Sequence, residues 1–258
     1  MKFRATLSKA SFRLFHDIIK DLYRLGPTLT FCLSPSELLL CLTPIGNTLQ
    51  GFAKLVISDF FSAFFIESRA ENHIAFQCNS KVMMQALSSG KEATVVSLRL
   101  LQQKGLCFLS CKLRAIDIEV VQNIPIHVLS MSAMEHFRPP FIPSSTIQLE
   151  IPLLTSNKHM KMVLDRMKSS HKSVIVSGNM EGTLSLKFKN DMMATETKFR
   201  KLIPRPDLNP PDVQMTTGCV KVECKMLSKA LTLMMHPGLA TPTSAFICCT
   251  FYYILYFV

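Results

Sequence analysis

The sequence predicts an α+β protein built from two copies of one unit, in which antiparallel strands form a sheet and two helices cover one side of it. Three observations favour this fold class. Two long amphipathic helices share the order of their charged residues, two short helices agree position by position, and the remaining regular segments alternate with the period of a β-strand. A duplicated α+β unit accounts for all three.

The first long helix is predicted over residues 8–25. Its apolar face follows a 3-4-3 spacing and consists of Phe12, Phe15, Ile19 and Leu22. Its charged face follows a 4-3-4 spacing and consists of Arg13, Asp17, Lys20 and Arg24. Gly26 and Pro27 end the segment, because both residues break helices.

The second long helix is predicted over residues 155–172, with Thr155 or Ser156 as its N-cap. Its apolar face consists of Met160, Val163, Leu164 and Met167. Its charged face consists of Lys158, Lys161, Asp165, Lys168 and Lys172. When Asp17 is aligned with Asp165, the apolar positions coincide and the basic–acidic–basic–basic order is shared.

Two short helices support the same duplication. Residues 79–87 align with residues 223–231, with Ala86 on Ala230. The offset between these alanines is 144 residues and that between the two aspartates is 148, which indicates one repeated unit of about 145 residues.

The segments between and after the helices have the pattern of strands. Residues 95–101 and 106–114 alternate apolar and polar side chains, and the Gln-Gln-Lys-Gly between them predicts a hairpin. Residues 174–188 form a second alternating pair, which turns between Gly178 and Gly182. Each half therefore combines two helices with several antiparallel strands.

The halves divide the chain into three parts. We predict a first domain over residues 1–125, a connector over residues 126–146 and a second domain over residues 147–258. The connector is assigned because residues 123–145 contain four prolines and show little periodicity.

The composition limits the class of function. The 258 residues are 48% hydrophobic, enough to bury a core, and carry a formal net charge of +11. Both halves are basic, which favours nucleic acid or an anionic membrane surface as a partner; ordinary excess surface lysine is the plainer explanation. The odd number of cysteines, nine, and the lack of an apolar signal segment favour reduced intracellular thiols.

No catalytic residue, metal site or cofactor is predicted. Cys107 with Cys111 and Cys219 with Cys224 could suggest zinc, but the first pair shares the apolar face of a strand, where buried thiols are the better explanation. His16 is expected at the edge of the core rather than as a ligand or base. The basic helix faces remain, and they suit phosphate contacts; two solvated helix faces are the alternative.

Residues 244–258 form an uncharged stretch that could be a membrane anchor. Fifteen helical residues would span roughly 22 Å, less than a hydrocarbon core of about 30 Å. Most of the stretch is β-branched or aromatic, so strands are expected there. A tail-anchored membrane protein with a basic cytosolic domain is the alternative function.

Several segments resemble a known family. The duplicated unit with paired basic helices resembles the sliding-clamp superfamily. The start MKFRA, the connector NIPIHVL, residues 149–188, residues 195–202 and the final YFV resemble the Hus subunit of the heterotrimeric checkpoint clamp, the nine-one-one complex. The likeness runs nearly from end to end, and MKFRA and the Ile-Pro-Ile of the connector are its specific signals.

The resemblance implies two tandem sliding-clamp domains with antiparallel sheets outside and helices lining the inner face. It implies a non-catalytic subunit of a nuclear DNA damage checkpoint clamp, which encircles double-stranded DNA and recruits signalling and repair factors. The implied partners are Rad-nine-like and Rad-one-like clamp subunits, an ATP-dependent clamp loader and repair enzymes, without a membrane or a cofactor. On this mapping the DNA-facing residues are Arg13, Lys20, Arg24, Lys81, Lys161, Lys168, Lys172, Lys225 and Lys229. A self-assembling processivity clamp for replication is a further alternative.

The resemblance also implies strand edges at which subunits meet, here at about 106–113 and 192–202. The second domain departs from the family pattern, because 27 residues follow Leu231 whereas 42 separate the aligned Leu87 from Leu129. We therefore expect the second domain to lack about one strand near the C-terminus.

Overall fold

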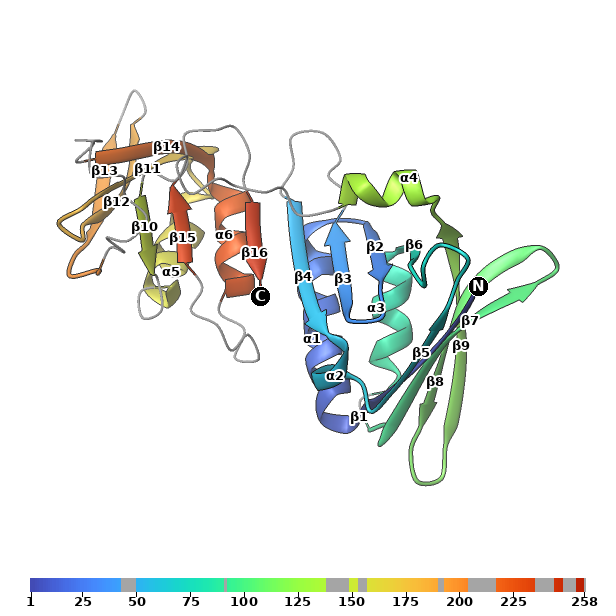
Figure 1. Ribbon diagram of the computed structural model, residues 1–258. Helices are drawn as coiled ribbons and strands as arrows, with labels where there is room; N and C mark the ends of the chain where they lie inside the picture. Colours follow the sequence, from blue (N-terminus) through green and yellow to red (C-terminus); the bar gives the residue numbers. More distant parts are fainter. Residues whose placement is uncertain are drawn as a thin grey trace. The chain divides into compact units, whose positions relative to one another are not determined.

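The chain folds into two compact units, one of residues 1–139 with 254–258 and the other of residues 140–253 (Figure 1). The computed structural model describes residues 1–42, 50–90, 92–137, 149–152, 157–189, 193–203, 217–234, 244–247 and 254–257. In these ranges, no helix has the length and apolar character needed to cross a membrane.

The first unit joins its strands into one sheet. Its elements in chain order are β1 (Lys2–Ser8), α1 (Lys9–Leu25), β2 (Thr28–Leu33), β3 (Glu37–Leu42), β4 (Gln50–Val56), α2 (Ile57–Phe60), β5 (Ala63–Glu67), β6 (Ile74–Asn79), α3 (Ser80–Ser88), β7 (Val95–Gln103), β8 (Leu106–Arg114), β9 (Glu119–Val128), α4 (Met131–Met134), the 3₁₀ helix η1 (Glu135–Phe137) and β16 (Ile254–Phe257). The strand order is β16-β4-β3-β2-β6-β9-β8-β7-β1-β5. All neighbours are antiparallel except β16 and β4.

The helices α1 and α3 lie side by side and pack on this sheet (Figure 1). Ser8 caps α1, because its hydroxyl accepts a hydrogen bond from the amide of Ser11. The predicted apolar face is confirmed as buried, with at most 2% of the surface exposed at Phe12, Phe15, Ile19 and Leu22. These side chains share one core with the inward-facing residues of the sheet, among them Leu7, Leu98 and Leu109.

The predicted hairpin of β7 and β8 has a tighter turn than expected. The strand pairing runs to Gln103 and Leu106, which leaves only Lys104 and Gly105 as the connection. Both have positive φ, 50° and 81°. Such angles are typical of a two-residue hairpin turn whose twist matches that of the strands.

The second unit contains two smaller sheets. Its elements are β10 (Leu149–Pro152), α5 (Asn157–Met167), β11 (Ser173–Asn179), β12 (Leu184–Lys189), β13 (Ala194–Phe199), β14 (Thr217–Glu223), α6 (Cys224–Met234) and β15 (Ser244–Ile247). One antiparallel sheet has the order β13-β12-β11-β14, and β10 pairs with β15 in the other. Its core includes Met160, Leu164, Leu186 and Leu231.

The strand orders confirm the duplication. In the first unit β4-β3-β2-β6 are neighbours in that order, and β13-β12-β11-β14 repeat it in the second. The pair of β1 and β7 corresponds to that of β10 and β15. The contact between α1 and α3 likewise corresponds to the contact between α5 and α6.

The two units differ in the strands that follow the second helix. In the first unit β8 and β9 join β7 to β6, so the sheet is continuous. Within the described parts of the second unit no strand joins β15 to β14, and they belong to separate sheets. The tail forms strands where it is described, and β16 lies in the first unit, with Ile254 opposite Gln50. The domain boundaries and the loss of a strand remain predictions.

The described part of the predicted connector is folded rather than extended. Residues 126–128 complete β9 and pair with β6, and residues 131–137 form α4 and η1. Phe137 packs beside Phe52 on the face of the sheet that is remote from α1, and its carbonyl accepts a hydrogen bond from Cys41 Sγ at 3.1 Å. Most of the prolines on which the connector is assigned lie outside the described residues, so the connector stays a prediction there.

Candidate nucleic-acid interface

The charged face of α1 lies opposite its buried face. Arg13, Lys20 and Arg24 are exposed, as the 4-3-4 spacing predicts. Arg24 Nη1 donates to Asp21 Oδ1 at 3.2 Å, and Asp21 is buried. Arg13 and Lys20 have no acidic partner in the described part of the chain. Both cations are therefore free of direct ion pairs in these ranges, and with Asp17 between them the charges of the three residues sum to +1.

Lys81 adds a cation at the start of α3. Asn79 caps this helix, because its side-chain oxygen accepts hydrogen bonds from the amides of Lys81 and Val82. The Lys81 side chain is exposed, and no acidic group among the described residues contacts it.

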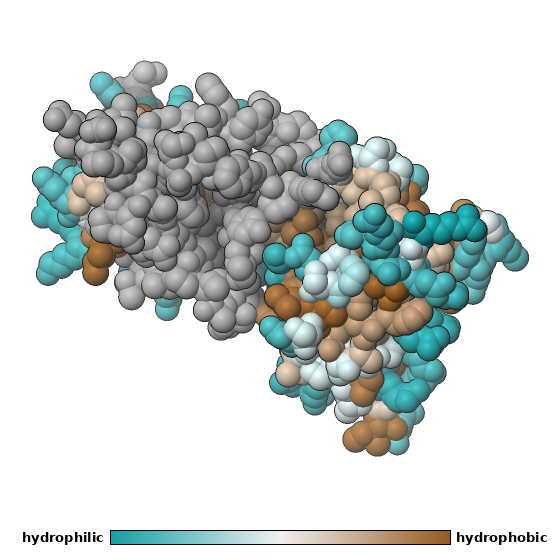
Figure 2. Space-filling model, viewed as in Figure 1, coloured by the Kyte–Doolittle hydropathy of each residue, from teal (hydrophilic) through white to brown (hydrophobic). Residues whose placement is uncertain are grey.

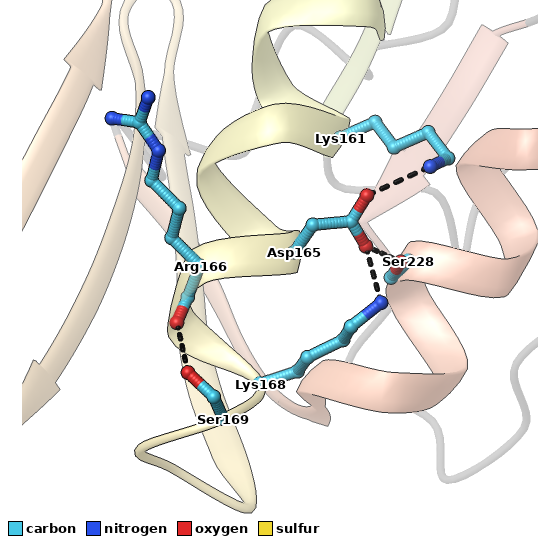
Figure 3. A network of polar contacts seen from close by, with 6 residues as sticks. All are labelled: Lys161, Asp165, Arg166, Lys168, Ser169 and Ser228. Carbon is cyan, nitrogen blue, oxygen red and sulfur yellow. Dashed lines mark hydrogen bonds and ion pairs between the residues drawn. The ribbon is translucent and has the colours of Figure 1, made fainter.

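In the second unit one carboxylate holds two of the predicted DNA-facing lysines (Figure 3). Asp165 Oδ2 accepts a hydrogen bond from Lys161 Nζ at 2.7 Å, and Oδ1 accepts one from Lys168 Nζ at 2.7 Å. Ser228 Oγ of α6 donates to the same Oδ1 at 2.6 Å. Donors from both helices thus converge on one group, and the charges of Lys161, Lys168 and Asp165 sum to +1.

The pKa of Asp165 reflects these contacts. Burial favours a raised pKa, but the hydrogen bonds from Lys161, Lys168 and Ser228 outweigh it and hold the pKa of Asp165 well below its usual range. The carboxylate is therefore charged at neutral pH. The sequence placed Asp165 in the charged stripe, but Ser228 was not predicted as its partner. Ser228 is a buried polar residue, and its place on the predicted helix 223–231 was the feature that could have pointed to it.

α5 is shorter than predicted. It ends at Met167, and the predicted cap at residue 155 or 156 lies outside the described residues. Ser169 Oγ donates to the carbonyl of Arg166, and the amide of Ser170 donates to the carbonyl of Met167 (Figure 3). A serine hydroxyl such as that of Ser169 competes with helical hydrogen bonding, and the Ser170 amide closes a tighter turn, which explains why the helix stops here.

The early end of α5 moves Lys172 off the helix. Lys168 directly follows the last helical residue, and its amide still donates to the carbonyl of Leu164, so it continues the stripe. Lys172 lies immediately before β11, so the prediction that it belongs to the helix is wrong. Lys172 is exposed and has no acidic partner among the described residues.

α6 supplies the remaining predicted residues. Lys225 is exposed and Lys229 is partly buried, and neither has an acidic partner in the ranges that the structure describes. The structure thus brings Lys225 and Lys229 onto the helix that contacts α5, and Lys81 onto the helix that contacts α1. The role of these residues toward DNA stays a prediction.

Other chemistry has little support in the described ranges. No group of three or more His, Cys, Asp or Glu side chains there is placed to hold a metal ion. His16 is partly buried, with Nδ1 3.3 Å from Asp17 Oδ1, in agreement with its expected place at the edge of the core. Cys111 is fully buried, and burial raises the pKa of its thiol to about 12; Cys107 is partly buried. The burial of Cys111 agrees with its predicted place in the core.

Of the two predicted subunit edges, the structure contradicts the first and is compatible with the second. β8 pairs with β7 on one side and with β9 on the other, so an edge at 106–113 is wrong. β9 pairs with β6 only over residues 126–128, which leaves one side of residues 119–125 without a strand partner among the described residues. β13 pairs with β12 alone in the same ranges, and it lies within the second predicted edge at 192–202.

Comparison with known proteins identifies the family and supports the fold. The Hus1-like protein family matches residues 1–251. The checkpoint protein HUS1 of Homo sapiens is 26% identical over 211 residues, 78% of this chain and 74% of that protein. The checkpoint protein hus1 of Schizosaccharomyces pombe is 26% identical over 202 residues, 76% of this chain and 69% of that protein.

A solved structure gives the same result for the fold. The crystal structure of PCNA from Thermococcus kodakaraensis superimposes with a TM-score of 0.64 at 16% identity, covering 94% of this chain and 87% of that one. At such low identity the likeness bears on the fold alone, which is that of a sliding clamp. Because the family match spans almost the whole sequence, the chain belongs to the Hus1-like protein family.

Proposed function

We propose that this protein is a non-catalytic subunit of a heterotrimeric DNA clamp in the DNA damage checkpoint. It works in the nucleus, encircles double-stranded DNA at damage sites and recruits signalling and repair factors. Its partners are a Rad-nine-like subunit, a Rad-one-like subunit and an ATP-dependent clamp loader. The single observation that carries the proposal is that equivalent helices in both units present exposed cations without acidic partners among the described residues.

The cations suit a sequence-independent contact with DNA. Lysine and arginine side chains on helices bind phosphates without reading bases, and such binding weakens as salt rises. The proposed DNA-facing residues are Arg13, Lys20, Arg24, Lys81, Lys161, Lys168, Lys172, Lys225 and Lys229. Within this set Lys161 and Lys168 contribute less, because Asp165 neutralises part of their charge.

The pairing of β16 with β4 within this chain is a model for how strands of neighbouring subunits would pair in a ring. β16, the last strand in the sequence, lies against β4. By the duplication β9 ends the first half as β16 ends the second, and β13 is the counterpart of β4. We therefore place the subunit contacts at the open side of β9, residues 119–125, and at β13, where strands of neighbouring subunits would pair.

The test begins with co-expression with the two candidate partner subunits and sizing of the complex. The assembled ring is then loaded on a nicked circle, and its retention is measured against salt. The double variant Lys20→Glu with Lys172→Glu should bind DNA with a less steep dependence of the logarithm of the binding constant on the logarithm of salt concentration. The slope is expected to change by about 2, since each phosphate contact contributes about −0.9. The matched control is Lys104→Glu with Lys189→Glu, which changes the charge equally at the β7–β8 turn and the end of β12.

Each outcome has a meaning. Equal retention of the two double variants would contradict the helix-face assignment. A stable homotrimer of this chain alone would favour the self-assembling replication clamp over an obligate heterotrimer. Membrane pelleting that resists carbonate and depends on residues 244–258 would favour the tail-anchored alternative.

A further inference from the structure

Two arginines face each other on the side of the first sheet that is remote from its helices. Arg4 of β1 lies directly opposite Arg99 of β7 in the antiparallel register. Both side chains are exposed, and neither has an acidic partner in the described part of the chain. Like charges directly opposite each other destabilise a strand pair. The fold therefore tolerates a repulsion here that nothing described offsets.

Other basic residues on this face are paired, which sets the two arginines apart. Lys2 Nζ lies 3.1 Å from Glu67 Oε2. Lys112 Nζ lies 2.7 Å from Glu119 Oε1, and Arg114 Nε lies 3.4 Å from Glu119 Oε2. These contacts lower the pKa of Glu119, first through the hydrogen bond from Lys112. These basic side chains on the face are thus ion-paired with glutamates, whereas Arg4 and Arg99 are not paired with an acidic group within the described residues.

The same cross-strand row places an exposed aromatic side chain beside the two arginines. The register places Phe65, Arg4, Arg99 and Ser110 in succession across β5, β1, β7 and β8, on one face. Phe65 is 52% exposed. Figure 2 shows, on the visible surface of the first unit, apolar areas bordered by hydrophilic side chains. Ser110 is fully buried although it lies on the outer face, and its hydroxyl has no hydrogen-bond partner among the described residues.

We propose that this row is a docking site for a phosphorylated, acidic peptide segment of a partner protein. Opposite residues of a strand pair have Cβ atoms about 5 Å apart, so two guanidinium groups can bind one phosphate dianion. Phe65 supplies apolar contact for a neighbouring side chain of the peptide. β5 pairs only with β1 in the described ranges, so the peptide backbone can add to its free edge.

Charge distribution favours a peptide over a nucleic acid at this site. A duplex is bound through an extended stripe of cations, whereas the neighbours of Arg4 and Arg99 on this face are neutralised by Glu67 and Glu119. Two adjacent cations beside an exposed phenylalanine fit a single phosphate next to an apolar residue. The site lies on the face opposite the helices, so it is independent of the proposed contact with DNA.

The experiment measures fluorescence anisotropy with the full chain. The probe is a fluorescein-labelled decapeptide of Glu and Leu with one central phosphoserine, and its unphosphorylated twin is the second probe. The phosphopeptide is expected to bind at least about tenfold more tightly than the twin, as charge-assisted hydrogen bonds to phosphate predict. Arg99→Glu is expected to remove this binding, while its melting temperature equals or exceeds that of the parent, because it puts opposite charges across β1 and β7.

The control is Arg13→Glu, which makes the same charge change on the helix side and should leave peptide affinity within about twofold. Four results would overturn the proposal. They are equal affinity for the two peptides, unchanged binding by Arg99→Glu, equal losses in Arg99→Glu and the control, and displacement of the peptide from the parent by a short DNA duplex. The last result would assign the patch to nucleic acid.

Discussion

Asp165→Asn tests whether one carboxylate ties α5 to α6. The substitution keeps the shape of the side chain and removes its charge, so the two lysine bridges and the charged hydrogen bond from Ser228 are lost together. Each lysine bridge on a helix surface contributes about 0.2–0.5 kcal/mol. A hydrogen bond to a charged group contributes about 1.5–3 kcal/mol, against about 1 kcal/mol for the neutral bond that an amide can still accept.

The expected loss in the free energy of unfolding is therefore about 1–3 kcal/mol, nearer the lower value because the Asp165 side chain is 31% exposed. The assay is urea unfolding together with amide hydrogen exchange of α5 and α6. A double-mutant cycle with Ser228→Ala isolates the link between the helices, with an expected coupling of about 0.5–2 kcal/mol. Asp117→Asn, on the exposed turn between β8 and β9, is the control and should change stability by at most about 0.5 kcal/mol.

The pH dependence has a defined sign. Because the pKa of Asp165 is depressed in the folded state, its contribution is complete above the unfolded value of about 3.9 and is lost as the pH falls below it. The difference between the parent and Asp165→Asn should be constant from pH 7 to about 5 and shrink at lower pH. A coupling energy near zero, or a difference that grows with acid, would refute the role assigned to this carboxylate.

Two further predictions concern a turn and the thiols. Gly182→Ala should destabilise the second unit by more than about 2 kcal/mol, because φ is +75° and the new Cβ would lie 1.8 Å from the carbonyl oxygen of Leu202. Gly105→Ala, at φ +81° in open space, is the control and should lower the free energy of unfolding by only about 1 kcal/mol. Urea unfolding measures both variants, and equal losses of stability would contradict the steric argument. At pH 8 iodoacetamide should label the exposed Cys219 at least about tenfold faster than the buried Cys78 and Cys111, whose pKa values burial raises to about 12. Peptide mass spectrometry measures these rates, and comparable labelling of all three thiols would contradict the burial.

The sequence predicted the parts of the fold that depend on periodicity. The apolar spacing of α1 identified its buried face, and the repeated order of charges identified the duplication that the strand orders confirm. These predictions succeed because a helix repeats every 3.6 residues, and burial of one face leaves a direct trace in the sequence.

The errors concern features that depend on local competition or on distant partners. At the end of α5 the Ser169 hydroxyl bonds the carbonyl of Arg166, a local contact that the charge periodicity through Lys172 concealed. The interior position of β8 depends on pairing with both neighbouring strands, and alternation within one strand does not reveal it. The contact of Asp165 with Ser228 joins residues 63 positions apart, and only the packing of two helices brings them together.

Equivalent aspartates have different surroundings in the two units, and this makes their helix faces unequal. Ser228 on α6, which bonds Asp165, corresponds in α3 to Met84, a residue that packs against the first core and has no hydroxyl to donate. Asp17 Oδ1 instead lies 3.3 Å from His16 Nδ1. Arg13 and Lys20, the counterparts of Lys161 and Lys168, accordingly have no acidic partner among the described residues.

The same backbone thus presents two different charge patterns. Arg13 and Lys20 make no ion pair among the described residues although Asp17 shares their face, whereas Lys161 and Lys168 both bind a carboxylate that Ser228 of α6 also contacts. Salt dependence of binding scales with the number of phosphates that are neutralised. If the helices meet DNA as proposed, Arg13 and Lys20 can each bind a phosphate directly, whereas Lys161 and Lys168 must first leave Asp165, which gives up part of that contact for a fixed arrangement of α5 and α6.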